Sequence, residues 1–302
     1  MAAQPNKQAK IISRIFGGIG NQLFCYAAAR RLALVNNAEL AIDDVSGFLR
    51  DRNYRRCYHL DHFSIPCRKA TATERLEPFS RVRRYLKRKA NLCRPFQIRN
   101  YIQQEGIDFD PRLLAVKPRG VLYIEGYWQS EQYFKDVDDS IKADLSIVPP
   151  QDMRNQEMAL RIRTRQAAVA VHVRFFDAPG VLALNNAPVY YYTRAIAQME
   201  ILVPDAHYFL FSDKPDAARS RIPLPDDRVT CVAHNQGDEN AYADLWLMTQ
   251  CQHFIIANST FSWWGAWLGE GADKIVLAPD LHIEGETAWG FAGLIPAGWL
   301  RI

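Results

Sequence analysis

The sequence of 302 residues lacks the signatures of several protein classes. It contains no run of about 18 apolar residues, and its polar, basic N-terminus leads into no apolar segment, so we expect neither a transmembrane anchor nor a secretory signal. The six cysteines form no CxxC pair and lie mostly in apolar runs, which predicts buried, reduced thiols rather than zinc ligands or disulfides. These absences favour a cytoplasmic protein.

Motifs for metal-dependent and covalent catalysis are also missing. The chain has no HExxH, no GxSxG and no DxD between apolar strands. Its adjacent aspartate pairs lack the middle residue of DxD and lie beside expected turns or helices; they are Asp43-Asp44, Asp138-Asp139 and Asp226-Asp227. We therefore expect no metal, and arginines and helix ends would have to meet the charge of a bound diphosphate.

Acidic residues are scarce in one segment. Residues 68–99 contain eleven Lys and Arg against two Glu, about +9, although the whole chain carries only +4. A solvated surface helix, a contact with anionic lipid headgroups and a contact with an anionic substrate all fit this composition. The aromatic residues of the segment lack the spacing of a nucleic-acid motif, so we expect no nucleic-acid partner. Peripheral contact with the inner face of an anionic membrane stays open.

Length and composition predict two folded domains. A chain of 302 residues exceeds the size at which a single core usually stops growing. The proportions of hydrophobic and charged residues, 48% and 23%, are typical of a globular protein. The pair Pro149-Pro150 would break regular structure, and a helical pattern at 152–163 follows it. We therefore predict domains at 1–150 and 151–302.

Short apolar runs alternate with helical patterns, which indicates an α/β fold. In the second half, buried parallel strands are predicted at 169–173, 207–211, 228–232, 254–257 and 274–277. Helical patterns accompany them at 191–202, 216–221 and 240–252, as in a doubly wound domain. In the first half, a strand at 9–16, a helix at 23–37 and a strand at 39–42 form a βαβ opening, and a further strand is predicted at 121–127.

The glycine-rich sequence GGIGN, residues 17–21, joins the first predicted strand to its helix. Glycines at such a junction let a phosphate approach backbone N–H groups at the positive end of a helix. The segment has neither the spacing of a dinucleotide-binding GxGxxG nor the lysine of a P-loop. A tight turn between strand and helix explains it equally well, so Gly20 and Asn21 are candidates only.

Polar side chains follow the first predicted strand of the second domain. His172 and Arg174 lie at its carboxyl end, where open α/β sheets place their ligand crevice, and Asp177 follows in the loop. Arginine suits a diphosphate because its planar fork donates two hydrogen bonds and keeps its charge. The alternatives are a core histidine, a surface or interdomain ion pair for Arg174, and a turn cap for Asp177.

Two more aspartates are candidate binding residues. Asp213 lies just after the strand predicted at 207–211, where it faces the same crevice or caps the next helix. Asp244 lies near the start of a helical pattern, where a carboxylate either favours the helix dipole or accepts hydrogen bonds from a base such as guanine.

The segment FIIANSTFSWWGAWLG, residues 254–269, reads as a buried strand, a polar turn and the beginning of a helix. Asn258, Ser259 and Thr260 bring polar side chains and amide groups to a helix N-terminus, which makes a phosphate site without a metal. The tryptophans that follow fit a buried helix better than a sugar-stacking surface, and we assign them no chemistry; they are Trp263, Trp264 and Trp267.

Five segments together resemble the motifs of the α-1,2-fucosyltransferases of glycosyltransferase family 11. They are GGIGNQLFCYAAARRLA (17–33), GYWQSEQYF (126–134), VAVHVRFFD (169–177), FLFSD (209–213) and DLWLMTQCQHFIIANSTFSWWGAWL (244–268). The resemblance spans nearly the whole chain. It implies a GT-B-like architecture of two Rossmann-like domains facing a cleft. It also implies GDP-β-L-fucose as donor, metal-independent inversion and a galactoside 2-hydroxyl of a glycan as acceptor.

The resemblance also implies roles for individual residues. His172 would lie by the nucleoside, Arg174 would hold the diphosphate and Asp244 would recognise guanine. The Ser259-Thr260 turn would complete the phosphate site. Gly20 and Asn21, which match the family's GxGNQ, would approach the pyrophosphate or the reacting sugar. Asp177 is the carboxylate that we would test as a base.

One motif departs from the family. The usual HxRRxD carries a second arginine, whereas this chain has Phe175 and Phe176. The change implies weaker diphosphate binding, a different donor pocket or compensation by another cation, for which Arg194 is one candidate. The alternatives are therefore a different GDP-sugar or linkage on the same fold, and a non-catalytic relative that binds a glycan or nucleotide.

Overall fold

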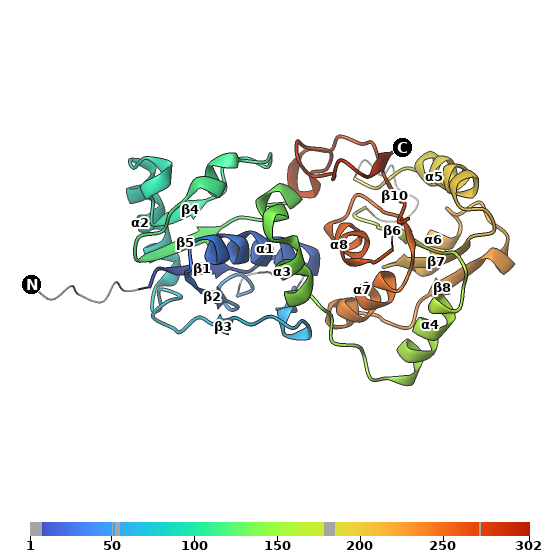
Figure 1. Ribbon diagram of the computed structural model, residues 1–302, viewed down its shortest axis with the longest axis horizontal. Coiled ribbons are helices and arrows are strands. Elements are labelled where there is room, and N and C mark those ends of the chain that lie inside the picture. The colour runs from blue at the N-terminus through green and yellow to red at the C-terminus, as the bar shows by residue number, and fades with distance from the viewer. Residues whose placement is uncertain (1–7, 50, 52–54, 178–184, 272) are drawn as a thin grey trace, which may run out of the picture. The chain divides into compact units, whose positions relative to one another are not determined.

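A computed structural model describes residues 8–49, 51, 55–177, 185–271 and 273–302 (Figure 1). The chain divides into two compact units, Met1–Ser146 and Ile147–Ile302. The boundary expected from the sequence, after residue 150, lies four residues beyond this division. Each unit contains one sheet in which every strand pairing is parallel, so both are α/β units.

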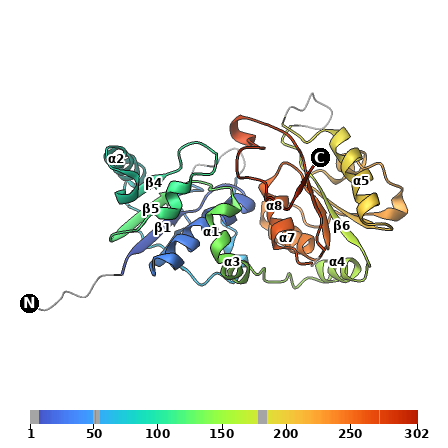
Figure 2. The same ribbon diagram turned by 45° about the horizontal axis from the view of Figure 1, so that its top comes forward.

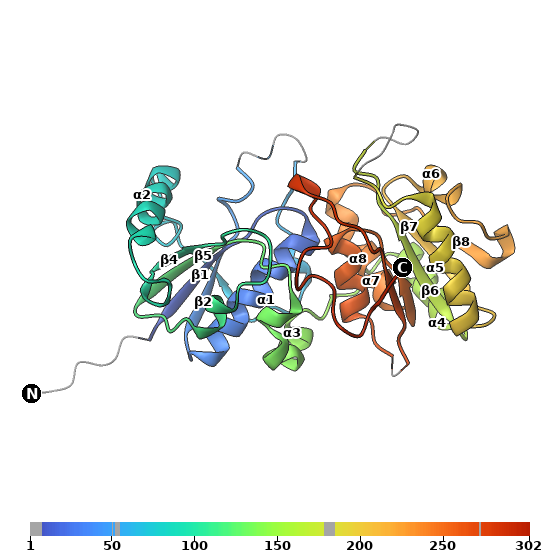
Figure 3. The same cartoon turned by 90° about the horizontal axis from the view of Figure 1, so that it is seen from above.

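The sheet of the first unit has the strand order β3-β2-β1-β5-β4. Its strands are β1 (Lys10–Arg14), β2 (Glu39–Asp43), β3 (Arg68–Lys69), β4 (Tyr101–Gln103) and β5 (Val121–Glu125). The helices are α1 (Ile19–Val35), α2 (Ser80–Leu92) and α3 (Asp138–Asp144). Helix α1 packs on β1 and β2 while α2 packs on β4, and the two helices lie on opposite faces of the sheet (Figure 3).

The two faces of this sheet differ in chemistry. Because side chains alternate along a strand, Ile11 and Ser13 point to the same face, where the Ser13 hydroxyl donates to the carbonyl of Cys25 in α1. On the other face Lys10 and Arg14 bind carboxylates, Lys10 with Glu74 at 2.6 Å and Arg14 with Glu125 at 2.8 Å. The face under α1 is therefore the apolar core, and the face under α2 is largely charged.

The sheet of the second unit has the order β11-β10-β9-β6-β7-β8. Its strands are β6 (Ala168–Val173), β7 (His207–Ser212), β8 (Val229–Val232), β9 (His253–Ile255), β10 (Val276–Ala278) and β11 (Leu300–Arg301). Its helices are α4 (Met153–Arg163), α5 (Val189–Leu202), α6 (Pro215–Arg219), α7 (Ala241–Thr249) and α8 (Thr260–Leu268). Helix α5 covers one face, while α7 and α8 lie together on the other (Figure 2).

The strand order of this unit has a switch point. From β6 the chain adds β7 and β8 on one side, then returns to place β9 on the other side of β6. Loops that leave neighbouring strands in opposite directions open a crevice at their carboxyl ends. The switch point between β6 and β9 is therefore the position at which an open α/β sheet is expected to bind its ligand.

The strands predicted in the second half are confirmed, with ends within two residues of those in the structure. The prediction of mostly buried cysteines is wrong. Of the six free thiols only Cys25 and Cys251 are buried, whereas Cys57, Cys93 and Cys231 are exposed. Cys231 lies on the edge strand β8, and Cys93 is the C-cap of the exposed helix α2, so apolar neighbours in sequence do not bring burial there. Among the described residues no helix has the length and apolar character needed to cross a membrane.

Candidate functional site

Most of the predicted binding residues meet at the carboxyl edge of the second sheet. His172 is the fifth residue of β6, Arg174 follows that strand directly, and Asp213 follows β7 directly. Asn258 and Ser259 connect β9 to α8. Since β9, β6 and β7 are neighbours, three separate segments contribute to one site at the switch point.

Arg174 and Asp213 form an ion pair at this edge. The Arg174 Nη1 lies 3.3 Å from the Asp213 Oδ2, and the other carboxylate oxygen accepts a hydrogen bond from the Phe175 amide at 3.2 Å. The alternative role of Asp213 as a helix cap is wrong, because Lys214 occupies the N-cap position of α6. Asp213 instead fixes the loop that carries Arg174.

His172 is buried and neutral. Burial, followed by the nearby charge of Arg174, lowers the pKa of its imidazole to about 3. The ring lies 5.2 Å from that of Phe261 in α8, and its Nδ1 has no hydrogen-bond partner in the described structure. A buried polar atom without a partner is costly. The Nδ1 therefore marks a place where a bound molecule can complete the hydrogen bonding.

Asp177 ties the loop that follows β6. Its carboxylate accepts hydrogen bonds from the Asn185 amide at 3.0 Å and the Asn185 Nδ2 at 3.1 Å. Both bonds stabilise the charged form and hold the pKa of Asp177 below its usual value. The geometry thus favours the turn-cap interpretation of Asp177 over that of a base, which needs a raised pKa to accept a proton near neutrality.

Asn258 forms hydrogen bonds with the backbone of the segment just before α5. Its buried Oδ1 accepts from the Ala187 amide at 3.1 Å, while its Nδ2 donates to the Asn185 carbonyl at 2.8 Å. Both side-chain groups are therefore engaged with the protein. Asn258 positions the Asn185–Ala187 backbone, which is a different task from touching a ligand.

Helix α8 begins at the site without a side-chain cap. Ser259 is the N-cap residue and makes no capping hydrogen bond, and Thr260 is the first helical residue. The first amide groups of a helix have no acceptor within the helix, so this end is suited to an anion. The predicted packing role of the three tryptophans is confirmed, since Trp263, Trp264 and Trp267 are all buried.

Asp244 lies in the first turn of α7 within a polar network that the sequence did not predict. Asn235 donates to the Asp244 Oδ1 at 2.8 Å and to the Asn155 Oδ1 at 2.8 Å. The Asn155 Oδ1 also lies 3.0 Å from the His234 Nε2. Burial raises the pKa of Asp244 to about 7. The polar run HNQGDEN after β8 was the available signal for this cluster.

In the first unit, the glycine motif is the start of α1. Gly17 adopts a left-handed φ of +80°, Gly18 is the N-cap, and Gly20 and Asn21 belong to the first helical turn. A side chain at Gly17 would be strained in that conformation and would also crowd Asn21. The predicted junction of strand and helix is confirmed.

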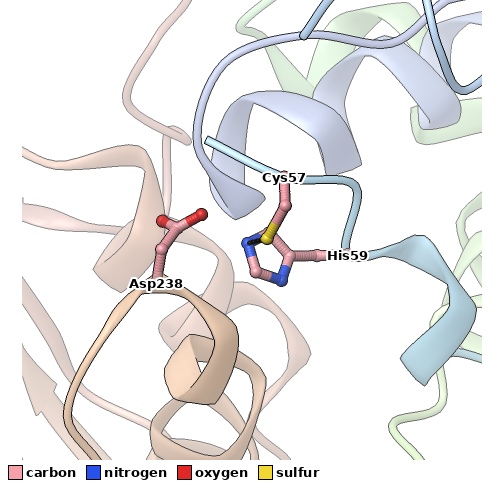
Figure 4. A group of neighbouring side chains, drawn as sticks. All are labelled: Cys57, His59 and Asp238. Carbon is pink, nitrogen blue, oxygen red and sulfur yellow. Dashed lines mark hydrogen bonds between the residues drawn. The ribbon is translucent and has the colours of Figure 1, made fainter. Parts of the chain in front are cut away.

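Gln22 holds this turn in place, a role that the sequence did not reveal. Its Nε2 donates to the carbonyls of Gly17 at 2.9 Å and Cys57 at 2.7 Å, and its Oε1 accepts from the His59 amide at 2.9 Å. Figure 4 shows the Cys57 and His59 side chains in contact, with the Cys57 Sγ 3.5 Å from the His59 Nε2. One buried amide therefore joins the glycine turn to the segment that carries Cys57 and His59.

The second motif of this unit, GYWQSE, meets the first. The Gln129 Nε2 donates to the Asn21 Oδ1 at 2.7 Å, and the Tyr127 ring stacks on Phe16 at 4.5 Å. Between them Trp128 has a left-handed φ of +55°, which is rare for a bulky residue and is found where a site is held under strain. Asn21 is therefore fixed by a motif more than a hundred residues further along the chain.

The departure at Phe175 has a structural explanation. Phe175 is buried in the core beneath α5, and the Arg221 guanidinium lies over its ring at 4.4 Å. Arg221 also donates to the Ala187 carbonyl at 3.1 Å. Arg194, the cation suggested from the sequence, is exposed on α5. Arg221, rather than Arg194, is the cation that lies beside Phe175.

Solved structures with a similar fold include fucosyltransferases. The α-1,6-fucosyltransferase NodZ from Bradyrhizobium, soaked with GDP-fucose, has a TM-score of 0.54 at 16% identity and covers 87% of this chain and 93% of its own. A mutant of Arabidopsis thaliana FUT1 in complex with GDP has a TM-score of 0.54 at 13% identity and covers 95% of this chain and 73% of its own. The predicted GT-B class of fold is thereby confirmed.

Sequence comparisons assign the chain to a family within that class. The model of glycosyl transferase family 11 matches residues 68–287, more than half of the chain. The chain therefore belongs to glycosyltransferase family 11. The O-antigen biosynthesis glycosyltransferase WbnK of Escherichia coli is 27% identical over 91% of this chain and 95% of its own. An α-1,2-colitosyltransferase of Escherichia coli is 27% identical over 97% of this chain and 98% of its own.

Proposed function

We propose that this glycosyltransferase moves L-fucose from GDP-β-L-fucose to a hydroxyl of a glycan acceptor, the 2-hydroxyl of a galactoside, with inversion to an α-1,2 linkage. The observation that carries the proposal is the convergence of Arg174, His172 and the N-terminus of α8 at the switch point of the second unit. An arginine and an uncapped helix end supply positive charge for a diphosphate without a metal ion.

The proposed reaction is a direct displacement at the anomeric carbon. The acceptor oxygen forms the new bond as the bond to the β-phosphate oxygen of GDP breaks, and the acceptor proton passes to solvent or to a base. Negative charge grows on the departing diphosphate, where fixed donors give their largest benefit. Arg174 suits this role because Asp213 already holds its guanidinium.

We propose that Asp244 recognises the guanine base of the nucleotide. Guanine offers two neighbouring N–H donors, and a carboxylate is the acceptor that matches them. Asn235 donates to the Oδ1 of Asp244, so the Oδ2 can accept from guanine. The Nδ1 of His172 can bind the nucleoside. Gly20 and Asn21 are proposed to contact the pyrophosphate or the sugar, with Gln129 fixing the Asn21 amide.

The acceptor proton needs no dedicated base in this proposal. Asp177 was the candidate from the sequence, but its carboxylate is engaged by Asn185 and its pKa is lowered. When the transition state resembles an oxocarbenium ion, the acceptor hydroxyl loses its proton late and a strong base contributes little.

A second candidate donor is GDP-colitose. The α-1,2-colitosyltransferase of Escherichia coli aligns over almost the full length of both chains. Colitose is L-fucose without its 3-hydroxyl, so the two donors share the nucleotide and differ at one hydrogen-bonding group. A site that hydrogen-bonds the 3-hydroxyl rejects the deoxy sugar strongly, whereas an apolar pocket hardly separates them.

Thermal unfolding with nucleotides tests the donor class. GDP binds only the folded protein in this proposal, so it should raise the melting temperature at a concentration well above its dissociation constant, while UDP and dTDP at the same concentration should not. Equal shifts with all three nucleotides would contradict recognition of guanine. Turnover of GDP-fucose and GDP-colitose then separates the two sugars and excludes a non-catalytic binding protein.

A further inference from the structure

Helix α2 carries its apolar side chains on the outside. They follow the i, i+3, i+4 spacing of one helix face, beginning at the N-cap. Their exposed fractions are 76% for Phe79, 56% for Val82, 51% for Tyr85, 59% for Leu86 and 56% for Leu92. We call these five side chains the outer stripe. It follows one face of the helix, with Lys89 standing between Leu86 and Leu92.

The face of α2 that packs on the protein is polar. Buried Asn91 donates to the Asn100 Oδ1 at 2.9 Å and accepts from the Asn100 amide at 2.8 Å. Arg88 donates to the Gln103 Oε1 at 2.9 Å, and Arg84 lies 4.0 Å from the Asp43 carboxylate. Specific contacts with the charged face of the first sheet thus fix the rotation of the helix. An ordinary surface helix has the opposite orientation, with its apolar face inward.

Basic residues border the outer stripe. Arg81 and Arg83 are exposed on either side of Val82, and exposed Lys89 lies within the stripe with its Nζ 5.8 Å from the centre of the Tyr85 ring. The helix carries six basic residues and no acidic one. An apolar face with long cationic side chains at its border is the pattern of a helix that lies in the interface of an anionic bilayer.

We propose that α2 binds the surface of an anionic lipid membrane, with the outer stripe in the boundary between headgroups and acyl chains. Arg81, Arg83 and Lys89 contact lipid phosphates in this arrangement. A second copy of the chain fits the face less well, because two such helices would oppose like charges. Nucleic acid would satisfy the charges and leave the stripe in water. The proposal is independent of which sugar the enzyme transfers.

Co-flotation of the full-length protein with vesicles tests the proposal. One set of vesicles is phosphatidylcholine alone, and the other is phosphatidylcholine mixed with phosphatidylglycerol. We expect binding to the anionic set, weakened at high salt, and little binding to the neutral set. The double variant Val82→Ser with Leu86→Ser should reduce the affinity by about tenfold or more, and Arg81→Glu with Arg83→Glu should do the same.

The matched control is Met153→Ser with Ile201→Ser. These side chains are 74% and 73% exposed but lie on α4 and α5, so the control removes equal apolar character elsewhere and should bind as the wild type does. Absence of binding to the anionic vesicles, or equal losses in the control and the stripe variant, would overturn the proposal. A dimer of wild-type protein in solution that the stripe variant dissociates would overturn it in favour of a contact between copies.

Discussion

The guanidinium of Arg174 lies 3.3 Å from the carboxylate of Asp213, across the ends of the neighbouring strands β6 and β7. The same carboxylate also holds the Phe175 amide, so one side chain fixes both the cation and its backbone. Preorganised charge costs no rearrangement when a diphosphate leaves. Asp213 therefore acts as a positioning residue in this account.

The proposed role of Arg174 predicts that a conservative substitution at this position causes a large loss of activity. Arg174→Lys keeps a positive charge and loses the planar fork that can donate two hydrogen bonds to a phosphate. We expect kcat for sugar transfer to fall about 10²-fold or more. Arg194→Lys, at an exposed position on α5, is the matched control and should leave kcat unchanged. A loss below about threefold in the Arg174 variant would rule out the diphosphate role.

The ion pair predicts non-additive effects. If Asp213 works by holding Arg174, then Asp213→Asn costs transition-state stabilisation only while the arginine is present. The double variant with Arg174→Lys should consequently be little worse than Arg174→Lys alone. Additive losses of kcat/KM would instead show that Asp213 touches the donor directly. The test is to measure kcat/KM for the wild type, the two single variants and the double variant.

The proposed role of Asp244 predicts that both the stability of the protein and its affinity for GDP depend on pH. Its pKa in the folded protein, about 7, lies above the usual value for aspartate, so the folded state binds the proton more tightly. The free energy of unfolding should therefore fall as pH rises from about 4 to about 7, and Asp244→Asn should remove this slope. Thermal unfolding across this range measures it.

Binding of GDP should show the opposite trend, because guanine needs the charged carboxylate. Affinity should rise with pH up to about 7, and the Asp244→Asn variant corrects for titration of the phosphates. Inosine diphosphate, which lacks the 2-amino group, should bind the wild type about tenfold more weakly than GDP and the variant by a smaller factor. Equal discrimination in both proteins would exclude contact between Asp244 and guanine.

Substitution of Asp177 tests whether its carboxylate acts as a general base in the reaction. Because its carboxylate serves Asn185, the variants Asp177→Asn and Asn185→Ala should resemble each other, with less than about tenfold loss of kcat, since a general base contributes about 10²–10⁴. Neither should remove a limb from the pH profile. Loss of more than about 10²-fold in Asp177→Asn, with normal activity in Asn185→Ala, would identify a catalytic base.

Much of the second unit was predictable because its inner strands, such as β6, β7 and β10, are short, apolar and almost fully buried. The positions of Arg174 and Asp213 directly after such strands sufficed to place them at one edge of the sheet. The first unit was harder, since the sheet face under α2 is charged and two of its strands, β3 and β4, have only two and three residues. The sequence also suggested Arg194 as the compensating cation, because α5 follows the motif, whereas Arg221 approaches Phe175 from the end of α6.

Long-range contacts account for most of what the sequence could not reveal. Gln22 reaches the backbone at Cys57 and His59, and Gln129 reaches Asn21. Neither pairing has a local pattern. The sequence indicated a basic segment that fits a surface helix, but which face of α2 points outward depends on contacts such as that of Asn91 with Asn100. The burial of each side chain shows which face of α2 points outward, and burial is known only from the structure.

Incubation with GDP-fucose and an array of glycan acceptors, with the product linkage read by NMR, tests the central claim most directly. We predict a new α-linked L-fucose on the 2-hydroxyl of a terminal galactoside, one GDP released for each sugar transferred, and formation of this product about 10²-fold slower or more with Arg174→Lys at equal protein concentration. Failure of folded protein to transfer any GDP-linked sugar, or transfer only from a UDP-sugar, would contradict it.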